Sequence, residues 1–206
     1  SGYAELIETG IAKPEDTPGF ARKIHVEASR MIQLVNDILQ LSHLDNVSET
    51  GAAPAMETVD LLDVARECVE RQKVNARHSY ISLTYLGESA PVTGSRVLLD
   101  ELCQNLCDNA IRYNRPGGKV QIITACTRDG HCTLTVKDNG IGIPQDSQSR
   151  VFERFYRVDK SRSKATGGTG LGLAIVKHIA VLHGARIDLE STVGTGTTIR
   201  IIFPKM

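Results

Sequence analysis

The sequence has no tryptophan, little aromatic content and no excess of charge of either sign. Aromatic residues make up 4% of its 206 residues, and 24 lysines and arginines balance 24 aspartates and glutamates. Because a protein that binds nucleic acid usually has a basic excess or a basic face, this balance gives no support to a nucleic-acid partner. No segment approaches the roughly 20 apolar residues that a membrane-spanning helix needs. We therefore expect a soluble globular chain of one or two domains.

The five cysteines include no Cys-x-x-Cys pair, and their odd number does not indicate a disulfide scaffold. A reducing cytosol is the environment that this usage favours. Cys103 and Cys107 share a helix face, but no second ligand pair lies near them in the sequence. We expect buried apolar thiols rather than a metal site.

The first 45 residues predict two helices of unequal length. Residues 1–11 have a helical apolar stripe that ends at a turn-rich segment, 13–19. Residues 20–45 have an apolar seam with spacings of four and three, typical of a helical bundle: Ile24, Ala28, Met31, Val35, Ile38 and Ser42. In an antiparallel hairpin the second helix would extend about 15 residues, or roughly 22 Å, beyond the first. We infer that an upstream continuation of the first helix is missing, or that another chain covers the seam.

The composition changes at residues 46–55, which are rich in Ser, Gly, Ala and Pro and predict a linker. We therefore divide the chain into a partial helical hairpin at 1–46, a linker at 47–55 and a second domain at 56–206. The second domain reads as an α+β fold, a mixed sheet with helices on one face. Its expected helices end near residue 78 and span 96–113 and 170–183, and its expected strands are 57–61, 80–86, 90–93, 119–127, 131–137, 186–190 and 197–203. The irregular stretch of about 30 residues after 137 is long enough to indicate a functional lid.

Two glycine-rich segments predict ligand contacts. Asp138 follows a strand, and a carboxylate there can accept a hydrogen bond from an exocyclic amine, while Gly140 and Gly142 allow a ring to approach the backbone. The segment Gly168–Gly172 leads into an apolar helix, so its backbone N–H groups suit phosphate oxygens. It matches neither a Walker A motif nor Gly-x-Gly-x-x-Gly, so the phosphate site is of another kind.

The helix predicted at 96–113 has Asn105 and Asn109 on one face. Their amide oxygens are suitable ligands for Mg²⁺. Arg112 can hold phosphate and Tyr113 can lie against a base or sugar.

Taken together and in this order, these segments resemble the sequence boxes of sensor histidine kinases. Residues 105–113 resemble the N box, 138–142 the G1 box, 152–155 the F box, and 168–172 the G2 box, while 194–197 is similar to the final Gly-Thr element. The resemblance covers residues 61–204. It implies the Bergerat ATP-binding fold, an α/β sandwich, in which residues from about 143 to 169 form the ATP lid.

The resemblance also implies roles for individual residues. Asp138 would hold the adenine amine, Asn109 would ligate Mg²⁺, and Asn105 would assist at the same site. Arg112, which stands where lysine is commoner, would contact phosphate, and Tyr113 would lie beside the nucleoside. The other expected ATP-binding residues are Gly140, Gly142, Ile143, Gly168, Thr169, Gly170, Leu171, Gly172 and Thr197. Phe152 and Phe155 are expected to anchor the lid in the core, and the basic run 150–164 to be a solvated lid face.

Asn105 distinguishes this chain from the ATP hydrolases of the same fold, which place a glutamate base at that position. A neutral amide cannot take a proton from water, so transfer to a bound nucleophile is favoured over hydrolysis. Glu101 could substitute only from about 6 Å further along the helix. An ATPase of the chaperone or DNA-repair type and a non-catalytic nucleotide-binding module remain as alternatives.

None of the six histidines is followed by the Glu or Asp and Thr-Pro that the family places after its phosphoacceptor. His25 and His43 lie on the second expected helix and the other four in the ATP domain. We expect the acceptor histidine upstream of Ser1, in a parent protein that forms a homodimer, passes phosphate to a response regulator, and is held in the bacterial plasma membrane by segments outside this cytoplasmic chain. This chain alone would then not phosphorylate itself.

Overall fold

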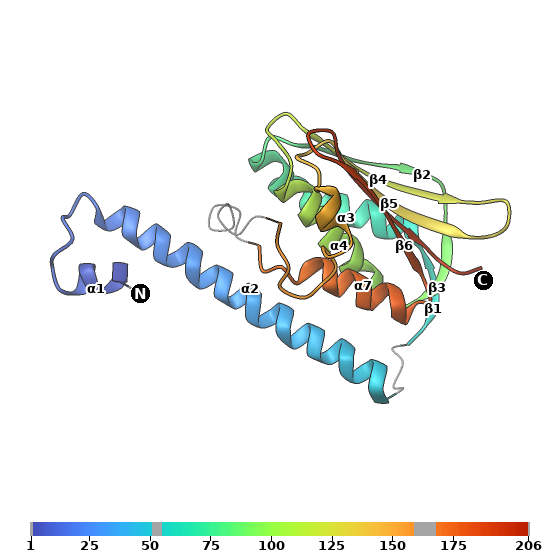
Figure 1. The fold of residues 1–206 in the computed structure, drawn as a ribbon, viewed down its shortest axis with the longest axis horizontal. Coiled ribbons are helices and arrows are strands. Elements are labelled where there is room, and N and C mark those ends of the chain that lie inside the picture. Colours follow the sequence, from blue (N-terminus) through green and yellow to red (C-terminus); the bar gives the residue numbers. More distant parts are fainter. Residues whose placement is uncertain (1, 51–54, 159–167, 206) are drawn as a thin grey trace.

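The computed structural model describes residues 2–50, 55–158 and 168–205. A short helix α1 (Gly2–Glu8) and a long helix α2 (Thr17–Thr50) precede a layered α/β unit, and α2 runs along one side of that unit (Figure 1). No helix within the described ranges is long and apolar enough to cross a membrane.

The α/β unit is built on a five-stranded sheet with the order β2-β4-β5-β7-β6. Its strands are β2 (Ser82–Gly87), β4 (Lys119–Cys126), β5 (Cys132–Asp138), β6 (Arg186–Thr192) and β7 (Gly196–Ile202). Only β2 and β4 pair in parallel, and the other neighbours are antiparallel. Helices α3 (Leu61–His78), α4 (Arg96–Arg112) and α7 (Gly172–Leu182) lie together on one face of the sheet (Figure 1). The prediction of a mixed sheet with helices on one face is confirmed.

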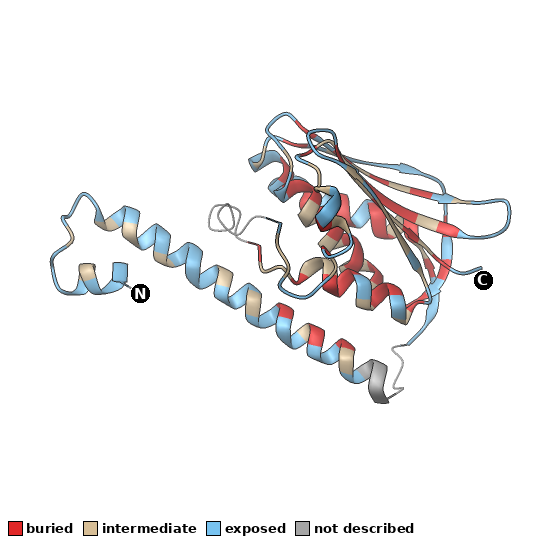
Figure 2. Ribbon diagram, viewed as in Figure 1, coloured by how far each residue is buried: buried red, intermediate tan, exposed pale blue. Residues whose placement is uncertain are grey.

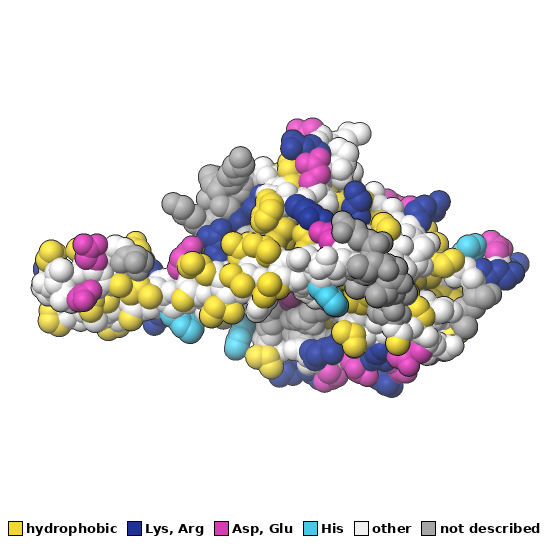
Figure 3. All heavy atoms as spheres, turned by 90° about the horizontal axis from the view of Figure 1, so that it is seen from below, with side chains coloured by type: hydrophobic (Ala, Val, Ile, Leu, Met, Phe, Trp, Pro, Cys, Tyr) yellow, Lys and Arg dark blue, Asp and Glu magenta, His cyan; other side chains and the backbone are white. Residues whose placement is uncertain are grey.

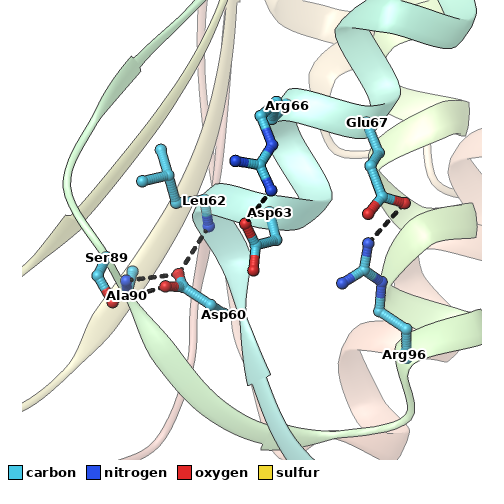
Figure 4. Close-up of polar contacts among 8 residues, drawn as sticks. All are labelled: Asp60, Leu62, Asp63, Arg66, Glu67, Ser89, Ala90 and Arg96. Carbon is cyan, nitrogen blue, oxygen red and sulfur yellow. Dashed lines mark hydrogen bonds and ion pairs between the residues drawn. The ribbon is translucent and has the colours of Figure 1, made fainter.

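The unit begins with a small two-stranded sheet of β1 (Glu57–Asp60) and β3 (Pro91–Gly94). Asp60 is the N-cap of α3, and one oxygen of its carboxylate accepts from the N–H groups of Leu62 and Ala90, at 2.9 and 2.8 Å. Its other oxygen accepts from the Ser89 hydroxyl, as Figure 4 shows. In the same view Arg96, at the start of α4, pairs with Glu67 of α3. The Asp60 contacts join the start of α3 to the segment before β3, and the Arg96–Glu67 pair joins the start of α4 to α3.

Buried side chains of the three helices and the inner face of the sheet form the core (Figure 2). Cys68, Cys103 and Cys107 are fully buried within it, as expected for apolar thiols. Cys126 and Cys132 form a disulfide, which the cysteine count did not predict. They are paired residues of the β4–β5 hairpin, whose turn lies at residues 128–130 as predicted.

Helix α2 is longer than predicted, because it continues through Thr50 into the expected linker; residues 51–54 lie outside the described part of the chain. Helix α1 packs against the start of α2, where the rings of Tyr3 and Phe20 are 5.1 Å apart. The predicted seam is exposed beyond this point: Met31, Val35 and Ile38 are 63%, 53% and 44% exposed. Figure 3 shows apolar side chains along the part of α2 that extends beyond the α/β unit. In this chain the seam therefore has no covering partner among the described residues.

Candidate functional site

Helix α4 presents Asn105 and Asn109 to a cavity of about 430 Å³ between the helices and the sheet. The two side chains are four residues apart and so share a face. The Asn105 side-chain amide donates to the backbone oxygen of Glu101, one turn earlier, at 3.1 Å. This contact holds its amide in place and leaves its oxygen directed towards Gly172, at the start of α7.

Asp138, the last residue of β5, lies at the other end of the cavity. Its Oδ1 accepts from the N–H groups of Gly140 and Thr197, at 2.8 and 3.3 Å. Burial raises the pKa of this carboxyl group, although the two hydrogen bonds oppose the shift. Its Oδ2 has no hydrogen-bond partner within the described ranges, and that oxygen is the one free to accept a donor from a ligand.

The glycines of the G1 segment are needed for close packing rather than for ligand contact alone. Gly142 has a φ of +72°, and a Cβ there would lie 2.2 Å from the backbone oxygen of Thr192. A Cβ at Gly140 would lie 2.4 Å from the backbone oxygen of Tyr113, at the end of α4. The segment after Asp138 is therefore pressed between α4 and the β6–β7 turn.

Two polar residues that the sequence analysis missed hold this segment in place. The Ser191 hydroxyl accepts from the N–H of Ile143 at 2.8 Å and contacts the Thr197 hydroxyl at 2.9 Å. The Gln148 amide donates to the backbone oxygens of both Ile143 and Ser191. Gln148 belongs to α5 (Gln145–Gln148), a single turn that the sequence did not predict.

The Gly168–Gly172 segment closes the cavity opposite the G1 segment. Gly168 lies under the side chains of Arg112 and Tyr113: a Cβ at this position would be 2.9 Å from Arg112 Nη1 and 3.2 Å from the Tyr113 hydroxyl. A Cβ at Gly172 would be 2.9 Å from Asn105 Oδ1. Side chains here would separate the loop from the helix that carries the two asparagines.

The cavity brings together most of the predicted site residues from four distant parts of the chain. Gly140 and Leu171 are the exceptions among the residues named above, since neither lines it, and Leu171 is fully buried in the core. The predicted residues that do line it are Asn105, Asn109, Arg112, Tyr113, Asp138, Gly142, Ile143, Gly168, Thr169, Gly170, Gly172 and Thr197.

The F-box segment differs from its predicted role. Phe155 is 58% exposed and has a φ of +63°, so it is not an anchor in the core, whereas Phe152 is half-buried. Of the basic run, Arg150 lies over the ring of Tyr156 at 4.4 Å, and Arg157 donates to the backbone oxygen of Gly168. Arg154 pairs with Asp45 of α2. Residues 159–167 of the expected lid, with the rest of the basic run, lie outside the described residues.

The composition of the cavity fits a nucleotide. A half-buried carboxylate with an open oxygen stands at one end, while amide side chains and a glycine-rich loop meet at the other. Apolar side chains, among them Val136, Ile141 and Ile199, lie between them and can cover a flat ring.

Comparisons with known proteins agree with this geometry. Residues 94–206 match the family model described as histidine kinase-, DNA gyrase B-, and HSP90-like ATPase. The whole chain is 42% identical to the sensor-like histidine kinase SenX3 of Mycolicibacterium smegmatis over 210 residues, which is 53% of that protein. The chain thus spans about half the length of the SenX3 relatives that it matches.

Two solved structures extend the comparison. The mycobacterial sensor histidine kinase MprB is 33% identical, with a TM-score of 0.63, and the match covers 73% of this chain and 98% of that one. The histidine kinase ThkA in complex with the response regulator protein TrrA has a TM-score of 0.74 at 22% identity, covering 100% of this chain and 56% of that one, and shows a common fold. The chain belongs to the family of histidine kinase-, DNA gyrase B- and HSP90-like ATPases, and within it to the sensor histidine kinases.

Proposed function

We propose that this chain is the kinase core of a two-component sensor histidine kinase, which binds Mg-ATP and transfers the γ-phosphoryl group to a histidine. The observation that carries the proposal is the cavity itself, in which Asp138 at the end of β5 faces the asparagines of α4 and the Gly168–Gly172 loop. Such an arrangement separates a base-recognition end from a phosphate end.

In this proposal Asp138 Oδ2 accepts from the adenine amine, and Tyr113 lies beside the nucleoside. Asn109 contributes an amide oxygen to Mg²⁺, and Asn105 supports it from the preceding turn. Arg112, which lies over Gly168, contributes a positive charge at the phosphates. Bound Mg²⁺ would neutralise charge on the phosphates during transfer.

Asn105 in place of a glutamate base favours transfer over hydrolysis. Glu101 does not line the cavity, and its Oε1 is buried with no hydrogen-bond partner in the described structure. Burial raises the pKa of Glu101 to about 7. It is thus basic enough to accept a proton but is placed away from the nucleotide. Steady ATP hydrolysis by this chain is expected to be slow.

The acceptor histidine is proposed to lie outside residues 1–206. His183 is buried, and His178 is bonded to Asp45, so neither is available to a phosphoryl donor. His25 and His43 are exposed on α2, but neither lines the cavity. The exposed seam of α2 supports a homodimer of the intact protein, and the fold shared with the ThkA–TrrA complex supports a response regulator as partner.

The test is transfer of labelled γ-phosphate from Mg-ATP to this chain and to a chain extended upstream in the same reading frame. We expect acid-labile label on histidine in the extended chain alone, and none when that chain carries Asn109→Ala. Label on the short chain that disappears with His25→Gln or His43→Gln would refute the placement of the acceptor. Rapid release of free phosphate without labelled protein would instead support an ATP hydrolase.

A further inference from the structure

Helix α2 contributes a buried carboxylate to the cavity, although it precedes the segment that matches the ATPase family. Asp37 is 6% exposed and accepts hydrogen bonds from the Gln33 amide and the Thr169 hydroxyl, both at 2.6 Å. Thr169 belongs to the glycine-rich loop, so the carboxylate is bound directly to the phosphate end of the site.

Asp37 is one of several residues that dock this face of α2 against the α/β unit. Leu41 and Leu44 are buried in the core, and Asp45 accepts from Arg154 and contacts His178 Nε2, each at 2.8 Å. The hydrogen bond from Arg154 helps to hold the pKa of Asp45 below its ordinary value, against the opposing effect of burial. The contact of α2 with the loop is therefore part of a continuous interface.

The surroundings of Asp37 make its charge unfavourable for a polyphosphate. Among the described residues no ion pair joins a lysine or arginine to Asp37, and Glu101 of α4 is a carboxyl close enough to interact with it. Arg112 and Arg157 line the same cavity, where they would meet the phosphates from other sides. The Thr169 hydroxyl has a single proton, which it donates to Asp37 and cannot also donate to a phosphate oxygen. Two like charges a few ångströms apart in a partly buried site repel strongly.

We propose that Asp37 is a selectivity residue that α2 adds to the nucleotide site: its carboxylate holds the Thr169 hydroxyl and opposes the terminal phosphates of a bound nucleotide. The inference rests on the proposed ATP site. The docked helix then weakens binding of a triphosphate more than binding of the nucleoside. By linkage, triphosphate binding weakens docking of α2 by the same factor.

The test is calorimetric titration of the full chain with Mg-ATP, Mg-ADP and adenosine. In Asp37→Asn, which keeps an acceptor but removes the charge, we expect the Kd for Mg-ATP to fall about tenfold, corresponding to about 1.4 kcal/mol. The effect on Mg-ADP should be smaller, and adenosine should be unaffected. Asp37→Glu keeps the charge and should not tighten Mg-ATP binding.

Asp45→Asn is the matched control, because it weakens the same helix interface away from the loop. Tightening that extends equally to adenosine, in either variant, would overturn the proposal, because it would show that loosening the helix interface and not the charge of Asp37 is responsible. Weaker Mg-ATP binding in Asp37→Asn would also overturn it, since Asp37 would then assist the bound metal. If the wild-type chain binds Mg-ATP and Asp37→Asn binds it with the same affinity, the role of Asp37 is refuted and the ATP site is not. If the wild-type chain binds neither nucleotide nor adenosine, the ATP site is refuted as well.

A second measurement uses the wild-type chain and does not depend on how a variant folds. Saturating Mg-ATP should increase amide hydrogen exchange in residues 34–45 of α2, and saturating adenosine should not. Protection of this segment by Mg-ATP would contradict the proposed opposition.

Discussion

Replacing Asp138 by asparagine is expected to change which base the cavity accepts. Asparagine is nearly isosteric, and its amide oxygen can take the place of Oδ1 as acceptor for the N–H groups of Gly140 and Thr197. Its NH₂ group then stands where Oδ2 stood. An adenine amine would meet a donor instead of an acceptor, whereas the 6-oxo group of hypoxanthine would meet a suitable donor.

The size of the effect follows from the burial of this group. Hydrogen bonds to charged groups contribute about 1.5–3 kcal/mol, and a buried donor left unpaired costs a similar amount. Mg-ATP affinity should therefore fall by about 10- to 150-fold, and Mg-ITP affinity should rise by about tenfold relative to the wild type. The thermal midpoint of the nucleotide-free chain should change little, because the contacts of Oδ1 are kept.

Competition titrations of Mg-ATP and Mg-ITP against both chains measure this exchange. A loss of Mg-ATP affinity below about threefold, or a parallel loss of Mg-ITP affinity, would refute the assignment of Asp138 to the base. Adenosine binding provides a pH check that is free of phosphate titration. Because burial raises the pKa of Asp138, wild-type affinity for adenosine should fall on acidification at a higher pH than an ordinary aspartate would allow, and the asparagine variant should lack this step.

Three further predictions concern stability and are checked by urea unfolding. His183→Ala should lower the free energy of unfolding by about 2–4 kcal/mol, because His183 Nε2 accepts the buried Ser95 N–H at 3.0 Å, whereas the exposed control His78→Ala should lower it by less than about 0.5 kcal/mol. Burial lowers the pKa of the His183 ring, so the stability that this ring contributes should also fall as pH drops below about 6.5. Hydrogen bonds from Ser89, Ala90 and Leu62 lower the pKa of Asp60 despite its burial; its stabilising contribution is present above the ordinary carboxyl range and is lost as pH falls through the lowered pKa, and Asp60→Asn should flatten that acid limb. Reduction of the Cys126–Cys132 disulfide, which joins residues only 6 apart in sequence, should cost about 2 kcal/mol, and Cys126→Ser should abolish the response to reductant.

Most of the α/β unit could be predicted from local sequence, because its helices and strands have a clear apolar periodicity and are separated by turn residues such as glycine. Helix α4 was expected at 96–113 and occurs at Arg96–Arg112, and the β4–β5 hairpin was placed by its turn at 128–130. The same hairpin register pairs position 126 with position 132, so the disulfide was within reach of the sequence. An odd number of cysteines argues against a scaffold in which every cysteine is paired. It does not argue against a single disulfide between two cysteines that face each other on neighbouring strands.

The contribution of α2 to the site could not be predicted in this way. The seam of α2 was identified from one apolar stripe, and Asp37 lies off that stripe, where a charged residue is usually solvated. Its partner Thr169 is 132 positions away, and no local pattern encodes a contact of that range. The prediction for Phe155 was wrong in the opposite direction, because this aromatic residue of a family motif was expected in the core. Its backbone is left-handed and its side chain is exposed.

The two faces of α2 define what can happen at the nucleotide site. At about 100° per residue, the exposed seam of Met31, Val35 and Ile38 lies roughly a quarter-turn from the face that carries Asp37 and Leu41. A partner that covers the seam therefore leaves the bond between Asp37 and Thr169 in place. A turn or slide of α2 against the α/β unit would break that bond, and such a motion would also strain the Asp45 ion pair with Arg154 two turns away. With Asp37 in its proposed role, rotation of this one helix is sufficient to change the affinity for a triphosphate without any rearrangement at Asp138.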